Sequence, residues 1–462
     1  MKTHPLTIGR LHIIGIGGIG MSSIAEVLHR LGHHVQGSDQ SANANTERLE
    51  KMGIRIFIGA KADHIENATT VIRSSAVRDT HVEVKAALDK NIAVLSRAEL
   101  LAEIMRYKAT ISVSGTHGKT TTTSLMATLL LHAGLDPTIL SGGILTDLHS
   151  NAHAGDGSWM VVEADESDKT FIQIPSTIAI ITNIEPEHME SYGSFENLKD
   201  SFVQFANGVP FYGFSVMCLD HPTVKEILPR IIKPHITYGT TSDADCYATN
   251  IQSSTQGMRF DAHFQDYSIL DVQLALHGHH NVLNALAVIV VGVKLGIFPD
   301  TIKKTLASFG GVKRRFTKVG EVNGITFIDD YAHHPTEIKA VLKAARGVGS
   351  GKVIAVVQPH RYSRLRDLFQ EFSTCFTDAD TVILAPVYSA GESPIQNISH
   401  QELANAVRTH FSGDVYTIES ESELAPLIAQ MAHSDDYVIL MGAGSISQWA
   451  HALPTQIKPL SR

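Results

Sequence analysis

The chain has 462 residues, of which 43% are hydrophobic and 18% are charged, as in an ordinary globular protein of about two to four domains. The net charge of −9 argues against a nucleic-acid partner, and no apolar run approaches the roughly 18 residues of a membrane span. Cys218, Cys246 and Cys375 show no metal or disulfide spacing, and no signal-peptide pattern precedes Leu11. We therefore expect a cytoplasmic protein without membrane insertion.

The first segment reads as a small doubly wound α/β unit. A strand is predicted over 11–14, a helix over 21–31, and further strands over 34–37, 70–72 and 92–95. Gly15, Gly17 and Gly20 follow the first strand, and Asp39 comes some twenty residues later, a spacing typical of dinucleotide binding. The pattern does not say which pyrophosphate binds, so NAD is the default expectation. The alternative is a glycine turn without a ligand.

The second segment opens with a candidate phosphate loop. A buried strand is predicted over 109–113 and a helix over 120–132, which Gly134 can cap. Between them, Gly115 to Lys119 would present backbone N–H groups and an ammonium to a polyphosphate. The usual loop would need glycine at Val113, so this loop is a shortened variant. A tight turn with a solvated lysine is the alternative.

Polar residues follow the next two predicted strands of this segment. Glu163 comes after a strand over 159–162, and His188 comes after one over 178–182. Because the carboxyl ends of parallel strands share one edge, these side chains and the Thr120 hydroxyl predict a Mg²⁺ site. Asp165, Glu166 and Asp168 could instead form a solvated acidic loop. A half-buried antiparallel strand is predicted over 258–264, and an apolar helix begins near residue 279.

The third segment begins near residue 312 and reads as a second Rossmann-like unit. Strands are predicted over 326–328, 352–357, 381–384 and 437–441. Arg314 and Arg315 at the boundary could turn toward a transferred phosphoryl group, although such a pair is commonly a solvated turn. The loops 329–335 and 358–364 each follow a strand and precede a helix, which indicates a substrate-facing rim.

Seven motifs, in order along the whole chain, resemble the Mur ligases: GTHGKTTTT, EADESD, TNIEPEHM, HHNVLNA, GVKRRF, DDYAHHPTE and QPHRYSR. The resemblance implies an α/β protein of three domains. Residues 1–107 would form a Rossmann-like domain that binds a UDP-sugar, so the first glycine turn would hold its pyrophosphate rather than NAD. Residues 108–312 would form the central ATP- and Mg²⁺-binding domain. Residues 313–462 would form a Rossmann-like domain that binds the amino acid and closes on ATP.

The resemblance also implies roles for individual residues. Lys119, Glu163, His188 and Arg315 would be catalytic, and Thr120, Glu163 and His188 would serve the metals. ATP would be bound by Gly115, Thr116, His117, Gly118, Lys119, Thr120, Thr121, Asn281, Asn284, Arg315 and Asp330. The UDP-sugar would be bound by Gly15, Gly17, Gly18, Gly20, Met21, Asp39 and Ser74, and the amino acid by Tyr331, His360, Arg361 and Arg364.

Within the family, the motifs are most similar to the branch that joins L-alanine to the lactyl carboxylate of UDP-N-acetylmuramate through an acyl phosphate, in peptidoglycan precursor synthesis. The cofactors would be ATP and Mg²⁺, and the chain would be a monomer or weak homodimer. Some Mur ligases carry a carbamylated lysine about fifteen residues past the metal histidine. Here only Lys199 lies nearby, several residues early, so we expect no carbamate. The rival functions are a tripeptide recycling ligase acting on the same UDP-sugar, an NAD-dependent dehydrogenase, and a regulatory protein that binds without catalysis.

Overall fold

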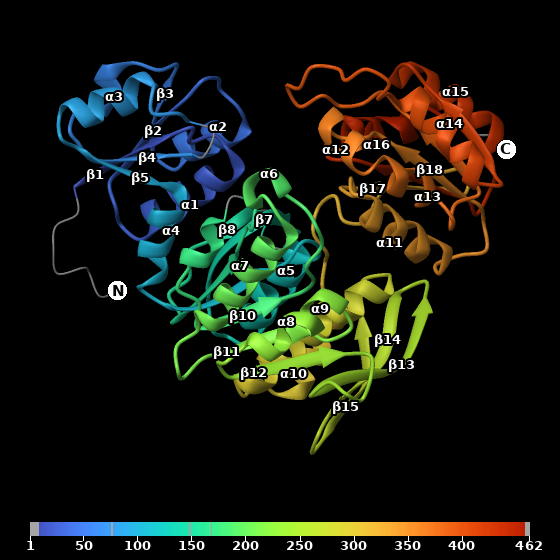
Figure 1. The fold of residues 1–462 in the computed structure, drawn as a ribbon, viewed down its shortest axis with the longest axis horizontal. Helices are drawn as coiled ribbons and strands as arrows, with labels where there is room; N and C mark the ends of the chain where they lie inside the picture. Colours follow the sequence, from blue (N-terminus) through green and yellow to red (C-terminus); the bar gives the residue numbers. More distant parts are fainter. Residues whose placement is uncertain (1–8, 75–76, 147, 149, 168, 458–462) are drawn as a thin grey trace. The chain divides into compact units, whose positions relative to one another are not determined.

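A computed structural model describes residues 9–457 apart from 75, 76, 147, 149 and 168. Three sheets of five, ten and six strands follow one another along the chain, each flanked by helices (Figure 1). The predicted α/β class is therefore confirmed. Asp168 lies outside the described residues, so the predicted acidic loop of Asp165, Glu166 and Asp168 is described only in part.

The first sheet is parallel and doubly wound, as predicted, with the order β3-β2-β1-β4-β5. Ile13 and Ile14, which are adjacent in its strand β1, point to opposite faces of the sheet and belong to two different apolar clusters. The strands are β1 (Arg10–Ile14), β2 (Val35–Asp39), β3 (Arg55–Ile58), β4 (Ala68–Arg73) and β5 (Ala93–Ser96). The helices are α1 (Ile19–Arg30), α2 (Ala44–Lys51), α3 (Val82–Asp89) and α4 (Arg97–Met105).

The second sheet has the order β15-β14-β13-β12-β11-β10-β6-β9-β7-β8. Helix α5 is buried from Thr120 to Leu130, which explains why its sequence has no polar face. The strands are β6 (Ala109–Ser114), β7 (Thr138–Leu145), β8 (Ser150–His153), β9 (Trp159–Glu163), β10 (Ile178–Ile181), β11 (Phe214–Cys218), β12 (His235–Gly239), β13 (Cys246–Ser254), β14 (Gly257–Phe264) and β15 (Ser268–Leu274). The helices are α5 (Lys119–His132), α6 (Met189–Tyr192), α7 (Phe195–Asn207), α8 (Pro222–Ile227), α9 (His279–Lys294) and α10 (Pro299–Ser308).

The third sheet has the order β16-β17-β21-β18-β19-β20, and only the edge strand β16 pairs antiparallel. Phe327 and Ile328 face apolar clusters on opposite sides of this sheet. The strands are β16 (Thr317–Val322), β17 (Ile325–Asp330), β18 (Val353–Val357), β19 (Thr381–Leu384), β20 (Asp414–Thr417) and β21 (Tyr437–Met441). The helices are α11 (Pro335–Arg346), α12 (Tyr362–Asp367), α13 (Phe369–Thr374), α14 (His400–His410), α15 (Leu424–Met431) and α16 (Ile446–Gln456).

Two element ends differ from the sequence prediction. Asp39 is the last residue of β2 rather than the residue after it, and Asp329 and Asp330 end β17 rather than opening the following loop. The carboxylates of Asp39 and Asp330 accept hydrogen bonds from backbone N–H groups of adjacent loops, which lets polar residues end these strands.

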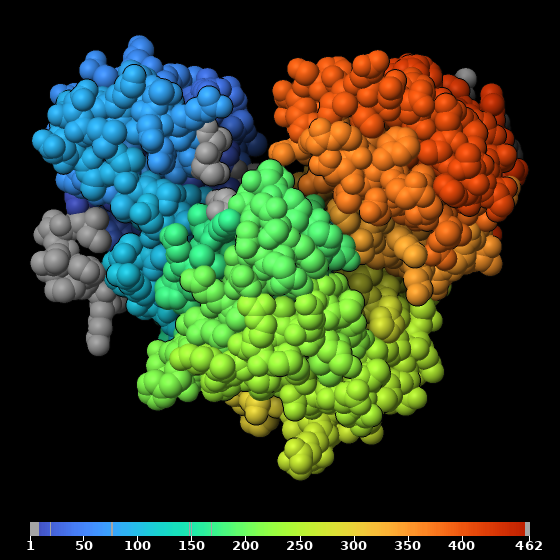
Figure 2. All heavy atoms as spheres, in the orientation of Figure 1, coloured from blue at the N-terminus to red at the C-terminus, as the bar shows by residue number. Residues whose placement is uncertain are grey.

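The described chain divides into two compact units. The first comprises residues 1–248, 262–269 and 283–306, and the second comprises 249–261, 270–282 and 307–462. The domain boundaries after residues 107 and 312 stay a prediction. Figure 2 shows that the green segment around α6 lies at the surface of the first unit. Of the described helices, none combines the length and the apolar composition that crossing a bilayer requires.

Candidate functional site

The predicted phosphate loop joins β6 to α5 and depends on two glycines with positive φ. Gly115 has φ +135°, and a Cβ there would lie 2.1 Å from Thr182 Oγ1. Gly118 has φ +82° and precedes α5 directly, and a Cβ there would lie 2.6 Å from Asn284 Oδ1. Only glycine combines this backbone with this close packing. The loop therefore places the free N–H groups of the first turn of α5, including those of Thr120 and Thr121, where an anion can bind.

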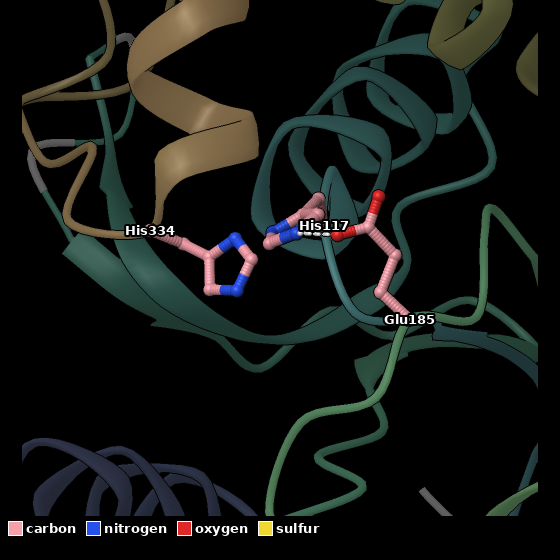
Figure 3. A group of neighbouring side chains, drawn as sticks. All are labelled: His117, Glu185 and His334. Atoms are coloured by element: carbon pink, nitrogen blue, oxygen red, sulfur yellow. Dashed lines mark hydrogen bonds and ion pairs between the residues drawn. The ribbon is translucent and has the colours of Figure 1, made fainter. Parts of the chain in front are cut away.

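A neighbouring strand end holds this loop in place. Asn183 accepts from His117 N–H through Oδ1 at 2.7 Å and from Thr116 N–H through its carbonyl at 3.1 Å. The N–H of Glu185 donates to Thr116 Oγ1 at 2.8 Å. The His117 imidazole lies 3.2 Å from the Glu185 carboxylate, and a dashed line in Figure 3 marks this contact. These contacts with the end of β10 fix the loop, whereas the sequence prediction rested only on the loop's own glycines and lysine.

Lys119 does not extend into solvent. Its ammonium donates to the carbonyls of Gly115 and Thr116 at 2.6 and 3.0 Å and to Glu166 Oε1 at 2.9 Å. Burial lowers the pKa of Lys119, but the charge and hydrogen bond of Glu166, together with the charges of Asp165 and Glu163, outweigh it and the net shift is upward. The turn with a solvated lysine is therefore excluded.

Thr120 and Glu163, two of the three predicted metal residues, lie together. Thr120 Oγ1 donates to Glu163 Oε1 at 3.0 Å, and Gly142 N–H donates to Glu163 Oε2 at 2.7 Å. A hydroxyl beside a carboxylate is a donor set that suits Mg²⁺, and both oxygens stand beside the first turn of α5. The residues present therefore fit the predicted ion.

His188 belongs to a different group of side chains from the one predicted. Its imidazole lies with the carboxylates of Glu166 and Glu187, and one donor atom from each falls within 4.8 Å of the others. Among the described residues, Glu163 is not in this group. Glu166 is only 2% exposed, and burial raises its pKa to about 7 although Lys119 opposes the shift. The solvated acidic loop is thus wrong for Glu166, because its carboxylate pairs with Lys119 inside the protein.

The first glycine turn is closed by its own acid. The N–H of Gly17 donates to Asp39 Oδ2 at 2.8 Å, and Asn45 Nδ2 donates to the Gly17 carbonyl at 2.8 Å. Gly15 has φ +75° and lies beside Ser74, and Gly18 precedes α1. The side chain of Met21 is buried in the apolar core, so only its backbone can serve a ligand.

A cavity of about 400 Å³ in the first unit brings two predicted groups of residues together. Ser74, assigned to the UDP-sugar, and Glu163, assigned to the metal, both line it. Its other charged lining residues include Arg73, Arg78, Arg97 and Asp165. The guanidinium of Arg97 packs on Gly20, where a Cβ would lie 3.0 Å from Arg97 Cζ. The three arginines were not predicted from the sequence, because single arginines outside any motif carry no signal.

The two asparagines assigned to the nucleotide lie one turn apart on α9. Asn284 packs on Gly118 of the phosphate loop, so it shapes the loop itself. Asn281 Nδ2 donates to the carbonyl of His277 at 2.8 Å. Reading of adenine by Asn281 stays a prediction.

In the second unit, Asp330 organises the loop that carries Arg315. Asp330 Oδ2 accepts from Phe316 N–H and Oδ1 from Ala332 N–H, both at 2.7 Å. Burial raises the pKa of Asp330 to about 6, and Arg315 opposes this shift. Arg315 lies over the Tyr331 ring at 5.3 Å and 3.9 Å from Glu337. Both carboxylate oxygens of Asp330 thus accept backbone hydrogen bonds within the protein. The ribose-binding role given to Asp330 stays a prediction.

His360, Arg361 and Arg364 lie together at the start of α12, as their motif predicts. Arg364 Nη1 is 3.4 Å from His360 Nδ1, and the His360 ring stacks on Tyr388 with centroids 5.5 Å apart. Burial, together with the nearby His333 and arginines, lowers the pKa of His360 to about 4. Tyr388 was missed, because it lies beyond β19 and meets this group only in the folded chain, through ring stacking and a β-bridge to His360.

The surroundings of Lys199 bear on whether this lysine can be carbamylated. Lys199 Nζ contacts Glu196 and lies 2.7 Å from Glu226 Oε1. These hydrogen bonds raise the pKa of Lys199 and favour its charged form. A carbamate forms on a neutral amine and would place an anion beside two carboxylates, so these contacts support the predicted absence of carbamylation.

In the second unit, His334, also labelled in Figure 3, caps helix α11 through Thr336 N–H.

Comparison with known proteins connects these features. Three family models match consecutive segments: the Mur ligase family catalytic domain over 10–109, the Mur ligase middle domain over 113–292 and the Mur ligase glutamate ligase domain over 314–444. The first family model ends, and the second begins, within the strand β6 that leads into the phosphate loop.

Individual relatives match over nearly their full lengths. UDP-N-acetylmuramate–L-alanine ligase of Mesorhizobium japonicum is 52% identical over 98% of this chain and 99% of its own, and that of Rhodopseudomonas palustris is 51% identical over 99% of both. Among solved structures, UDP-N-acetylmuramate-alanine ligase of Thermotoga maritima has a TM-score of 0.81 and 28% identity, covering 97% of this chain and 99% of its own. A murein peptide ligase of Psychrobacter arcticus has a TM-score of 0.69 and 25% identity, covering 97% and 98%. With half of its residues shared over nearly all of its length, the chain belongs to the Mur ligase family.

Proposed function

We propose that this chain uses ATP to join L-alanine to the lactyl carboxylate of UDP-N-acetylmuramate, a step of peptidoglycan precursor synthesis. The full-length relatives that are about half identical to it carry this activity in their names. The Thermotoga maritima structure, which resembles it with a TM-score of 0.81, is that of a UDP-N-acetylmuramate-alanine ligase. The partners would be the UDP-sugar and L-alanine in the cytoplasm.

The cavity in the first unit is the observation that carries this proposal. It is lined by Ser74, by Arg97, which packs on the first glycine turn, and by Glu163, which accepts from Thr120 beside the phosphate loop. A UDP-sugar seated here would direct its sugar toward the nucleotide. The arginines would offset the negative charge that a carboxylate brings toward a polyphosphate.

The reaction needs an anion to attack another anion. The lactyl carboxylate would attack the γ-phosphate, giving an acyl phosphate and ADP, and the neutral amine of L-alanine would then displace phosphate through a tetrahedral intermediate. Lys119, Arg315 and the N–H groups at the start of α5 would stabilise the transferred phosphoryl group. Mg²⁺ held near Thr120 and Glu163 would supply further positive charge to the phosphates.

The deciding experiment is phosphate release with UDP-N-acetylmuramate, comparing L-alanine with the tripeptide that a recycling ligase would use. We expect release with L-alanine and little with the tripeptide. The reverse preference would assign the chain to the recycling reaction, and nucleotide binding without release would indicate a regulatory protein.

Two controls exclude the remaining alternatives. Replacing Lys119 by Ala should abolish UDP-sugar-dependent ADP release, so retained turnover would contradict the proposed site. Nicotinamide absorbance should stay flat under the same conditions, whereas a change would favour a dehydrogenase.

A further inference from the structure

Arg361, one of the residues predicted to bind the amino acid, has a strained backbone. It directly precedes α12 with φ +71° and ψ +137°, a combination that is rare for any residue other than glycine because a side chain crowds the neighbouring backbone there. Such a conformation costs free energy and persists only where the surroundings enforce it. The contacts that enforce it therefore bear on where the Arg361 side chain points.

The segment after β19 holds the chain at Arg361 itself. Arg361 N–H donates to the carbonyl of Tyr388 at 2.8 Å, and Tyr388 N–H donates to the carbonyl of Pro359 at 2.8 Å. The rings of His360 and Tyr388 also stack, with an interplanar angle of 10°. These contacts fix the chain up to the N–H of Arg361.

Glu392 holds the chain two residues later. Ser363 N–H donates to Glu392 Oε2 at 2.9 Å, and Ser363 Oγ donates to Oε1 at 2.6 Å. Burial raises the pKa of Glu392, but hydrogen bonds from Ser363, the charge of Arg361 and a backbone hydrogen bond of Tyr362 outweigh it, so the pKa is lowered and the carboxylate is ionised at neutral pH. Hydrogen bonds to an ionised carboxylate are about twice as strong as those between neutral groups.

A tight turn joins the two contacts. Glu392 N–H donates to the carbonyl of Ser389 at 2.9 Å, and the residues between them, Ala390 and Gly391, both have positive φ, +48° and +88°. One short segment, 388–392, therefore holds the chain both at Arg361 and at Ser363. Rotation of the Arg361 backbone toward an ordinary φ would have to break one of these contacts.

We propose that Glu392 is a positioning residue for the amino-acid substrate: with the Tyr388 carbonyl it holds the strained backbone of Arg361 and so aims the guanidinium at the carboxylate of L-alanine. An arginine recognises a carboxylate through two parallel N–H···O bonds, which need a fixed orientation of the guanidinium. This inference rests on the proposed function and on the amino-acid role predicted for Arg361. Because Glu392 acts through Arg361, its loss should affect L-alanine and not the other two substrates.

The test is phosphate release by the full-length chain at saturating ATP and UDP-N-acetylmuramate, with L-alanine varied. Glu392→Ala should raise the KM for L-alanine about ten- to hundredfold and leave the KM values for ATP and the UDP-sugar within about twofold. Glu392→Gln keeps an acceptor for Ser363 N–H and a donor for its hydroxyl, so its KM for L-alanine should stay within about fivefold of the wild type. An unchanged KM for L-alanine in Glu392→Ala, or equal rises for all three substrates, would overturn the proposal.

Replacing Arg361 by glycine separates positioning from a general loss of structure. Arg361→Gly removes the guanidinium and adopts φ +71° without strain, so nothing remains for Glu392 to hold. Adding Glu392→Ala to Arg361→Gly should therefore change the KM for L-alanine by less than about twofold, although Glu392→Ala alone has a large effect. A full additional rise in the double variant would contradict positioning through Arg361.

Ser363→Ala decides the question if Glu392→Ala does not fold. It removes only the hydroxyl contact of 2.6 Å and should raise the KM for L-alanine about threefold or more. Glu371→Ala, at an exposed residue of α13, is the control and should leave this KM unchanged. If Ser363→Ala behaved like Glu371→Ala, the proposal would be wrong.

The wild type in the same assay tests the proposed function separately. If it releases phosphate with L-alanine and the Glu392 variants show no selective effect, only the positioning role fails. If the wild type releases no phosphate with L-alanine, the proposed function fails and this inference fails with it.

Discussion

The backbone N–H of Gly17 donates to the carboxylate of Asp39 at 2.8 Å, so the acid at the end of β2 closes the glycine turn at the end of β1. In a dinucleotide fingerprint the acid at this spacing is expected on a ribose instead. Here Asp39 fixes the shape of the turn, and a Cβ on Gly17 would lie 2.9 Å from its carboxylate. The spacing of the motif is the same, but the acid contacts the protein itself.

Asp39→Ala should therefore weaken UDP-sugar binding through the turn. Losing a hydrogen bond to a charged acceptor leaves the Gly17 N–H unpaired, and we expect the KM for UDP-N-acetylmuramate to rise about ten- to hundredfold. The KM for ATP should not change, because the phosphate loop lies on another sheet. Asp39→Asn, which keeps an acceptor, should stay within about threefold of the wild type. An unchanged KM in Asp39→Ala would show that the contact does not shape the site.

Gly115→Ala should destroy the phosphate loop. At φ +135° the new Cβ would lie 2.1 Å from Thr182 Oγ1, so a steric clash adds to a backbone cost of about 1–3 kcal/mol. We expect loss of binding of a fluorescent ATP analogue and a lower thermal unfolding midpoint.

Gly134→Ala is the matched control at the other end of helix α5. Its φ is +73°, and none of the described atoms lies within 4 Å of the added Cβ, so only the backbone cost of about 1 kcal/mol applies. Nucleotide binding should persist in this variant. If Gly115→Ala lost no more nucleotide binding and no more thermal stability than Gly134→Ala, the clash at Gly115 would have to be relieved by movement elsewhere.

Asp330→Ala should loosen the loop that carries Arg315. It leaves the N–H groups of Phe316 and Ala332 without their acceptor, which costs about 2–4 kcal/mol of unfolding free energy when two partly buried donors are involved. We expect a higher KM for ATP together with a lower thermal midpoint. Asp414→Ala, at an exposed residue of β20, should change stability by less than about 0.5 kcal/mol. A normal midpoint for Asp330→Ala would contradict this role.

Glu83 should make the stability of the first unit depend on pH. It is fully buried and accepts from Ser38 Oγ at 2.5 Å, and its oxygens lie 3.2 Å from His12 Nε2 and 2.8 Å from His64 Nδ1. Burial raises the pKa of Glu83, but these partners together lower it to about 2 from 4.5. A lowered carboxyl pKa stabilises the fold above the unfolded value of 4.5, and this contribution is lost as the pH falls from 4.5 toward 2.

Glu83→Gln should therefore cost about 3 kcal/mol of unfolding free energy at pH 7, and the difference from the wild type should shrink below pH 4.5. Urea unfolding midpoints measured between pH 7 and pH 3.5 test this expectation. Glu66→Gln, at an exposed residue, should follow the wild type at every pH. A difference that stays constant with pH would mean that the ionisation of Glu83 is not what stabilises the fold.

Local pattern was sufficient for the elements that carry the site. Glycine turns between apolar strands and helices placed β1 with α1 and β6 with α5, because positive φ and strand burial are properties of neighbouring residues. The motif of His360, Arg361 and Arg364 likewise acts within one short stretch of chain. Element ends were less well predicted: Asp39 and Asp330 are the last residues of their strands rather than loop residues, since contacts with distant loops determine where a strand stops.

The amino-acid sequence by itself determined the α/β class, the two glycine turns and the family of the chain, because each depends on residues adjacent in the chain or on an ordered set of motifs. Only the tertiary structure decided which side chains meet. Lys119 and Glu166 are 47 positions apart, and their pairing follows from parallel strands that end at the same edge of one sheet. Arg97 similarly reaches Gly20 through the packing of α4 beside the first turn. Such meetings depend on how elements pack, which no spacing along the chain encodes.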